Sequence, residues 1–142
     1  MIMIKLSGRE KILLETALRA VDKAYVLWGF QVGAAVLAED GKIYEGCNVE
    51  SWVSGLGVCA ERNAVNHAVS HGNRRIMEIA VVMDADSQND PKPCGACLQY
   101  IYDFAENPNI KIVMAKVKDG KILSETVQAE TLRAMLPFPY RK

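Results

Sequence analysis

The sequence lacks a net charge, a long apolar run and any repeated or low-complexity segment. Its 17 basic and 17 acidic residues cancel, so there is no electrostatic reason to expect nucleic acid or an anionic membrane as a partner. No stretch approaches the length of a membrane span. Charged side chains interrupt the N-terminal segment, which is unlike a signal peptide. We therefore expect a cytoplasmic protein that binds a small, roughly neutral molecule.

The length of 142 residues is usual for one domain, and half of the residues are hydrophobic. Such a chain can build a core without disulfide staples, and disulfides are rare in the cytoplasm. The four cysteines are Cys47, Cys59, Cys94 and Cys97. In this compartment clustered cysteines are more often metal ligands or catalytic groups. We expect one domain over residues 1–142.

The pattern of apolar and polar residues predicts helices that alternate with strands. Ser7 and Glu10 form a capping-box pattern, which marks the start of the first helix. Asp40-Gly41 is a strong hairpin signal, and Asp119-Gly120 is a second turn. Helices are predicted over 8–23, 60–71, 95–105 and about 129–136, strands over 31–39, 42–49, 76–83 and 111–117, and loops over 51–58 and 84–93. This order predicts an α/β sandwich, and the hairpin makes its sheet mixed.

Three of the cysteines lie where two predicted helices begin. Cys94-Gly95-Ala96-Cys97 opens one helix, and residues three apart share a helical face, so both sulfurs can reach one ion. Cys59 opens another helix, and only tertiary folding is needed to bring it to the pair. Helix N-termini carry partial positive charge, which favours the thiolate that binds zinc. Three sulfur ligands leave one tetrahedral position open, as in catalytic rather than structural zinc sites.

Glu61 and Arg62 follow Cys59 closely in the chain. A carboxylate beside a zinc-bound water can take its proton and return it to a leaving group. Three thiolates around a divalent cation sum to a negative charge, which Arg62 is placed to offset. Two alternatives are a closed zinc site that uses Cys47 as fourth ligand and a redox dithiol. The dithiol would leave Cys59 and Glu61 unexplained.

These motifs resemble those of one known family. Cys-Ala-Glu at 59–61 with the Pro-Cys-Gly-Ala-Cys segment at 93–97 resembles the signature of zinc nucleoside deaminases. Further matching pieces occur in family order over nearly the whole chain: Phe30-Gln31-Val32-Gly33-Ala34-Ala35, Gly46-Cys47-Asn48-Val49-Glu50, Cys59-Ala60-Glu61-Arg62 and Met135-Leu136-Pro137. The chain is therefore similar to the small homotetrameric cytidine deaminases.

The resemblance implies a fold and an activity. The implied fold is a three-layer α/β/α sandwich around a mixed five-stranded sheet. The implied activity is that of an aminohydrolase acting on cyclic amidines, which converts cytidine or deoxycytidine to the uridine product and ammonia. It uses one Zn²⁺ per chain, and its active sites form between the subunits of a homotetramer.

The resemblance also implies roles for individual residues. Zinc would be held by Cys59, Cys94 and Cys97, protons would be moved by Glu61, and Arg62 would temper the charge of the sulfurs. The substrate would be bound by Phe30 and Ala60 at the base, by Asn48 and Glu50 at the ribose, and by Tyr140 of a neighbouring subunit.

The departures from the family pattern surround the substrate rather than the zinc. Leu27-Trp28-Gly29 takes the place of the family's Pro-Tyr-Ser, and Ser51-Trp52 takes the place of its Asn-Ala. Tyr140 takes the place of its C-terminal Phe. The ending Leu136-Pro137-Phe138-Pro139-Tyr140 resembles blasticidin S deaminase, which shares the zinc chemistry but lacks the carboxylate of Glu50. We expect a cytosine nucleoside, with a modified nucleoside or blasticidin S as alternatives.

Other interpretations stay open at this stage. A zinc-structured binding module without turnover would need Cys47 as its fourth ligand. The simpler interpretation of Cys47 is a buried free thiol. A deaminase of polynucleotides shares the chemistry, but the balanced charge and short loops argue against it. His67 and His71 could pair on a metal, but without the Glu of a zincin motif they are better explained as a surface helix face. Trp28 and Trp52 are either pocket walls or packing residues.

Overall fold

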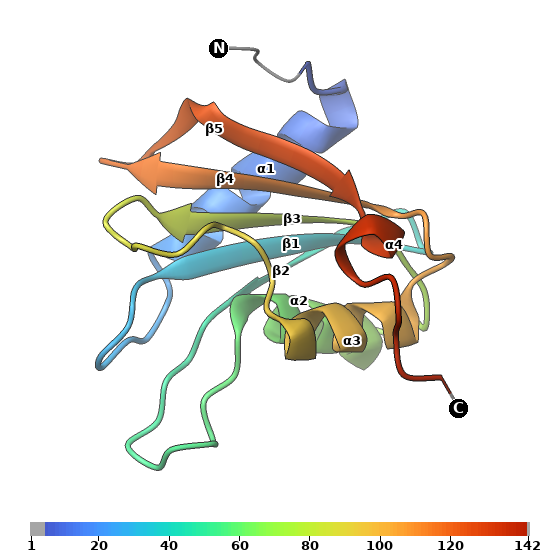
Figure 1. Ribbon diagram of the computed structural model, residues 1–142, viewed down its shortest axis with the longest axis horizontal. Helices are drawn as coiled ribbons and strands as arrows, with labels where there is room; N and C mark the ends of the chain where they lie inside the picture. The colour runs from blue at the N-terminus through green and yellow to red at the C-terminus, as the bar shows by residue number, and fades with distance from the viewer. Residues whose placement is uncertain (1–4, 142) are drawn as a thin grey trace.

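A computed structural model describes residues 5–141, whose five strands form one mixed sheet between helical layers (Figure 1). The strands are β1 (Val32–Ala38), β2 (Ile43–Cys47), β3 (Ile76–Asp84), β4 (Lys111–Lys118) and β5 (Lys121–Thr131), and the helices are α1 (Gly8–Val21), α2 (Ala60–Ser70), α3 (Gly95–Phe104) and α4 (Leu132–Met135). The sheet order is β2-β1-β3-β4-β5, with β3 and β4 parallel and the other neighbouring pairs antiparallel. The predicted fold class is confirmed.

The helices cover both faces of the sheet, α1 on one face and α2 with α3 on the other (Figure 1). Successive strand residues point to opposite faces. In β1, Ala34 and Val36 therefore pack in the core beneath α2, whereas Ala35 and Leu37 pack against α1. This double burial explains why β1 is a continuous apolar run rather than an alternating one.

Helix α1 begins with the capping box that the sequence predicts. The hydroxyl of Ser7 accepts from the backbone N–H of Glu10, and the Glu10 carboxylate accepts from the backbone N–H of Ser7, both at 3.1 Å. The helix ends at Val21, two residues before the predicted end. The other helices end within a residue of their predicted positions, apart from the C-terminal one.

Helix α2 lies unusually close to strand β2 because Gly46 has no side chain. A Cβ atom at Gly46 would lie 2.3 Å from the backbone nitrogen of Ala64. The contact is therefore between two backbones. Beside it, the Nδ2 of Asn63 donates to the carbonyl of Cys47 at 2.8 Å. Together these contacts fix the first turn of α2, which is the turn that carries Glu61.

The C-terminal region differs from the pattern-based prediction. No strand was predicted between 118 and 128, and residues 129–131 were assigned to a helix, but β5 runs from Lys121 to Thr131. Its side chains are exposed or half-buried throughout, so it shows no clear alternation. Thr126 interrupts the ladder, because its hydroxyl accepts from the N–H of Lys116 where the register shifts. Of the helix predicted over about 129–136, the structure contains only the short helix α4, which is capped by Thr131.

Among residues 5–141, no helix combines the length and the apolar character needed to cross a membrane.

Candidate active site

The three sulfurs predicted to bind zinc come together at the starts of two helices. Cys59 is the N-cap of α2 and Cys94 is the N-cap of α3, both in extended backbone conformation. Cys97 lies in the first turn of α3 and is fully buried. The three sulfur atoms lie within 4.8 Å of one another. Two helix N-termini thus direct their positive ends at one sulfur cluster.

The geometry of this cluster suits zinc. A tetrahedral ion with Zn–S bonds of about 2.3 Å places its sulfur ligands about 3.8 Å apart. Since the three sulfurs lie within 4.8 Å of one another, a contraction of at most about 1 Å brings them to that value. Three sulfurs would occupy three corners of the tetrahedron, which would leave the fourth for water or substrate. Cysteine thiolates are also the ligand type that selects zinc over magnesium or calcium.

The pKa values of the clustered cysteines also fit the binding of a cation. Interaction with Cys97, followed by Arg62, lowers the pKa of Cys59 to about 5 against the opposing effect of burial. The same interaction, with burial, raises the pKa of Cys97. A metal ion that binds the cluster would displace the remaining protons, since the ligands must be thiolates.

Arg62 supplies positive charge next to the sulfurs. Its Nη2 lies 3.8 Å from the sulfur of Cys59. Within the described part of the chain, its Nε atom is buried without a hydrogen-bond partner. Buried donors are ordinarily satisfied, so Arg62 has hydrogen-bonding capacity to spare at this cluster. The charge-offsetting role of Arg62 stays a prediction, which this placement supports.

Glu61 is buried beside the cluster. Its exposed fraction is 6%, and burial, followed by the nearby Cys59 thiolate, raises its pKa to about 7. A carboxyl group with a pKa near neutrality can both accept and donate a proton at physiological pH. A bound zinc ion would lower this pKa by its charge. Glu61 therefore has the environment of an acid–base group rather than of a fourth ligand.

A cavity of about 410 Å³ opens at Cys59, Glu61 and Cys94. Of the residues predicted to bind substrate, Asn48 and Ala60 line it, whereas Phe30, Glu50 and Tyr140 do not. The sequence analysis missed five lining residues: Val32, Met83, Asn89, Asp90 and Lys92. The last three lie just before the Pro93-Cys94 step, and this adjacency to a ligand was the signal that could have identified them.

Phe30, Asn48 and Glu50 are nevertheless joined to one another. The Oδ1 of Asn48 accepts from the N–H of Val32 at 2.8 Å, and its Nδ2 donates to the carbonyl of Phe30 at 2.9 Å. Glu50 accepts from backbone N–H groups of the preceding loop, residues 27–29. The phenyl ring of Phe30 is partly exposed. Asn48 thus joins Phe30, which does not line the cavity, to a residue that does.

Tyr140 lies outside the cavity of its own chain. Its backbone N–H and C=O are both bound by the side-chain amide of Gln99 on α3, at 2.8 and 3.0 Å. Its ring is largely exposed. The C-terminal segment is thus attached to the helix that carries Cys97, while the aromatic side chain of Tyr140 is free of its own subunit.

The other candidate ligands do not join the cluster. In residues 5–141, Cys59, Cys94 and Cys97 are the only group of three or more His, Cys, Asp or Glu side chains placed to hold an ion. Cys47 is half-buried, and burial raises the pKa of its thiol. The rings of His67 and His71 pack on each other and on Tyr44. These contacts fit the interpretation that His67 and His71 belong to a surface face of α2 rather than to a metal site.

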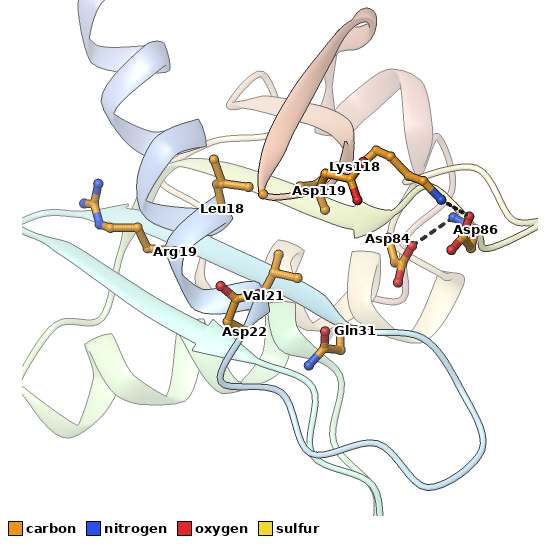
Figure 2. Close-up of a pocket in the computed structure, with 11 residues that line it drawn as sticks. Leu18, Arg19, Val21, Asp22, Gln31, Asp84, Asp86, Lys118 and Asp119 are labelled. Atoms are coloured by element: carbon orange, nitrogen blue, oxygen red, sulfur yellow. Dashed lines mark hydrogen bonds and ion pairs between the residues drawn. The ribbon is translucent and has the colours of Figure 1, made fainter.

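A second hollow, of about 350 Å³, lies on the α1 face of the sheet (Figure 2). It is lined by acidic side chains, of which Asp86 is paired with Lys118 at 2.7 Å. Gln31 and Asp84 line this hollow, whereas their sequence neighbours Val32 and Met83 line the sulfur cavity. The two hollows are therefore back to back across the same ends of β1 and β3.

Comparison with known proteins decides the family. The model of the family described as "Cytidine and deoxycytidylate deaminase zinc-binding region" matches residues 8–115. A cytidine deaminase of Sporosarcina psychrophila is 39% identical over 134 residues, which cover 94% of this chain and 91% of that protein. The chain belongs to the cytidine deaminase family. It is accordingly a zinc-dependent hydrolytic deaminase, with the three-cysteine cluster as the place for one zinc ion.

Two further matches describe how this cytidine deaminase family member relates to others. The crystal structure of a cytidine deaminase from Burkholderia pseudomallei superposes with a TM-score of 0.79 at 33% identity, covering 95% of this chain and all of that one. A protein named blasticidin-S deaminase from Bacillus cereus is 27% identical and aligns over 96% of both chains. The two substrate classes considered from the sequence are thus both represented among the relatives.

Proposed function

We propose that this chain hydrolyses the exocyclic amino group of cytidine or deoxycytidine and releases ammonia. The observation that carries the proposal is a buried carboxyl group, Glu61, which lines one cavity together with Cys59 and Cys94 of the three-sulfur cluster. A closed structural zinc site has no such position. The cavity volume of about 410 Å³ is within the range of small-molecule sites.

Cys59, Cys94 and Cys97 would hold the zinc ion, which when bound makes a water molecule acidic enough to lose its proton near neutral pH. Glu61 accepts that proton and passes it to N3 of the pyrimidine ring, while the hydroxide oxygen forms a bond to C4. Glu61 then takes a second proton, from the hydroxyl group now on C4, and gives it to the amino group. The C4–N bond breaks, ammonia leaves, and the C4 carbonyl of the uridine product remains. Arg62 offsets the negative charge of the thiolates, which would otherwise oppose loss of the proton.

The substrate is expected to lie between the sulfur cluster and the rim of the cavity. Backbone groups at Ala60 would bind the edge of the base, and Phe30 would pack against the ring. Asn48 and the segment held by Glu50 would face the sugar. Tyr140, whose ring is largely exposed while its backbone is bound to Gln99, would complete the site of a neighbouring chain in a homotetramer.

A cytoplasmic location and a small-molecule substrate, without nucleic acid, complete the proposal. Three free thiols within 4.8 Å of one another persist as ligands in a reducing compartment, whereas an oxidising one would favour disulfides. The net charge of +0 gives no attraction for a polynucleotide.

The test is the release of ammonia by zinc-loaded protein from cytidine, deoxycytidine, 5-substituted cytidines and blasticidin S. Turnover of cytidine or deoxycytidine supports the proposal. Turnover of blasticidin S alone would support the second candidate, which is favoured by the full-length match to the Bacillus cereus protein. The absence of turnover on every substrate, with zinc content verified, would contradict both.

A further inference from the structure

The side chain of Gln99 binds the backbone of Tyr140 at two atoms. Its Oε1 accepts from the N–H of Tyr140 at 2.8 Å, and its Nε2 donates to the C=O of Tyr140 at 3.0 Å. The same Nε2 donates to the carboxylate of Asp103, one helical turn further along α3, at 3.0 Å. A primary amide has one acceptor oxygen and two N–H donors. The oxygen and both N–H groups of Gln99 therefore have partners.

These partners determine which way the amide of Gln99 points. With its oxygen and nitrogen exchanged, the oxygen would face the C=O of Tyr140 and the carboxylate of Asp103, and the nitrogen would face an N–H donor. All of these contacts would then be repulsive. Glutamate has the same shape as glutamine, but its ionised carboxylate has no donor for the C=O of Tyr140 and carries the same charge as Asp103. Of the two side chains, only glutamine matches these partners.

The C-terminal segment 136–140 is held at both of its ends. At its start, the N–H of Leu136 donates to a carbonyl of α4 at 2.8 Å, and the Leu136 side chain packs on the hydrophobic core. Pro137 and Pro139 each fix one backbone angle along the segment. The segment runs from α4 past α3 (Figure 1), where Gln99 binds its far end. The backbone at position 140 is thus fixed relative to α3.

The side chain at this fixed position is left exposed by its own chain. Tyr140 is 78% exposed, and neither Tyr140 nor Gln99 lines the sulfur cavity of its own chain. Burial of an aromatic ring stabilises a fold by more than a neutral hydrogen bond does. An anchor that served stability alone would therefore be expected to bury the ring. Here the hydrogen bonds hold the backbone and leave the ring available to another chain.

We propose that Gln99 is a positioning residue for the reaction in a neighbouring subunit, because it fixes the backbone of Tyr140 so that the tyrosine ring enters that subunit's cavity. The inference rests on the proposed function, which supplies both the substrate and the neighbouring chain. Gln99 lies two residues after Cys97, which binds zinc in its own chain. Helix α3 therefore serves its own site through its cysteines and a second site through Gln99.

Mixed oligomers distinguish this role from support of Cys97 within the same chain. Gln99→Ala is co-refolded with an excess of Glu61→Gln, whose own sites lack the proton-transferring group. Positioning across subunits predicts that kcat/KM per chain with intact Glu61 rises toward the wild-type value, because the Glu61→Gln chains supply intact Gln99 and Tyr140. Support of Cys97 within one chain predicts no rise. That result, with mixed oligomers verified by mass spectrometry, would overturn the proposal.

The single variants give the size of the effect. A neutral hydrogen bond contributes roughly 2- to 12-fold to an equilibrium, so loss of two should lower the kcat/KM of Gln99→Ala on cytidine roughly 5- to 150-fold, with zinc retained. Gln99→Glu should lose at least as much, since it introduces repulsion. Asn109→Ala is the matched control, because the Asn109 amide binds Arg133 of α4, at 3.2 Å, instead of Tyr140. Loss of zinc from Gln99→Ala would contradict the proposal.

A double variant shows whether Gln99 acts through Tyr140. In the Tyr140→Ala background the ring is already absent, so Gln99→Ala should lower kcat/KM no further, within about twofold. If Gln99 acts on the site by any other route, the two losses multiply. A double variant whose loss equals the product of the single losses would therefore refute the positioning role.

A cross-linking measurement reports the position of residue 140 without any substrate. The photoreactive side chain of p-benzoylphenylalanine replaces that of Tyr140 in the zinc-loaded protein, which is then irradiated. The proposal predicts a product of two chains on a denaturing gel, joined at a peptide that lines the cavity. Its yield should fall several-fold in Gln99→Ala and stay unchanged in Asn109→Ala.

An equal yield of this product with and without Gln99 would overturn the inference, as would cross-linking within one chain only. Absence of turnover in the wild type on every substrate would instead overturn the proposed function. The cross-linking yield would in that case still decide whether Gln99 positions residue 140 against a neighbouring chain.

Discussion

The Nη2 nitrogen of Arg62 donates to the sulfur of Cys59 across 3.8 Å, one helical turn further along α2. Replacement of Arg62 by Gln removes the positive charge that offsets the thiolates. We expect zinc affinity to fall roughly 10- to 100-fold, as is typical when a group that supports a ligand is lost. Competition with a chromogenic chelator measures this. Arg74→Gln is the control, since Arg74 binds carbonyls at the other end of α2. Equal affinity in both variants would refute the role of Arg62.

Glu61→Gln should retain zinc and lose turnover. The amide keeps the size of the side chain but cannot accept and return a proton, so kcat should fall roughly 10²- to 10⁴-fold. Zinc content is measured together with ammonia release. Glu78→Gln serves as control, because Glu78 is an equally buried carboxyl that pairs with Arg9 outside the sulfur cavity. Unchanged ammonia release in Glu61→Gln would remove this residue from the mechanism.

Cys47→Ser should keep one zinc ion per chain. Cys47 stands outside the group of three sulfurs, so its loss removes no ligand. Cys94→Ser, by contrast, removes one of three thiolates and should lose most of the metal after dialysis. Metal analysis of both variants distinguishes the open site from the four-cysteine alternative. Loss of zinc from Cys47→Ser would favour a closed site, and with it a binding module without turnover.

Gly46→Ala should destabilise the protein by about 1–3 kcal/mol, the usual cost of overpacking. The added Cβ meets the backbone of α2, and neither the strand nor the helix can move without disturbing the sulfur cluster. Zinc affinity should therefore fall together with stability. Urea unfolding measures the first and chelator competition the second. Gly8→Ala is the matched control, since a Cβ there meets nothing within 4 Å. A Gly46→Ala protein as stable as the wild type would show that the close contact carries no weight.

Mixing two inactive variants tests the arrangement of subunits. If Tyr140 completes the site of a neighbouring chain, Tyr140→Ala and Glu61→Gln fail for different reasons. Mixed oligomers then contain sites with an intact Glu61 from one chain and an intact Tyr140 from another. We expect ammonia release to return in part after co-refolding. Continued inactivity, with mixed oligomers verified by mass spectrometry, would confine Tyr140 to its own subunit.

The sequence predicted the sulfur cluster better than the rim of the cavity. Two motifs at helix starts contain Cys59, Cys94 and Cys97, and helix geometry alone brings the latter two together. Asn89 and Lys92 were missed because a loop has no periodicity from which the direction of a side chain follows. Strand β5 was missed because an edge strand, half-exposed on both faces, shows neither an alternating nor a continuous apolar pattern. The hydrogen bonds to Glu50 come from the backbone N–H groups of residues 27–29, and no residue pattern indicates where backbone donors point.

The two hollows that lie back to back at the ends of β1 and β3 limit how these strands can change in length. Val32 and Met83 line the cavity of the sulfur cluster, and Gln31 and Asp84 line the hollow on the other face of the sheet. A single-residue deletion or insertion within either strand would exchange the faces. In β3 it would turn the carboxylate of Asp84 towards the cavity that Cys59 and Cys94 line. Among relatives, we therefore expect insertions and deletions to fall in the connections, while β1 and β3 vary by substitution alone.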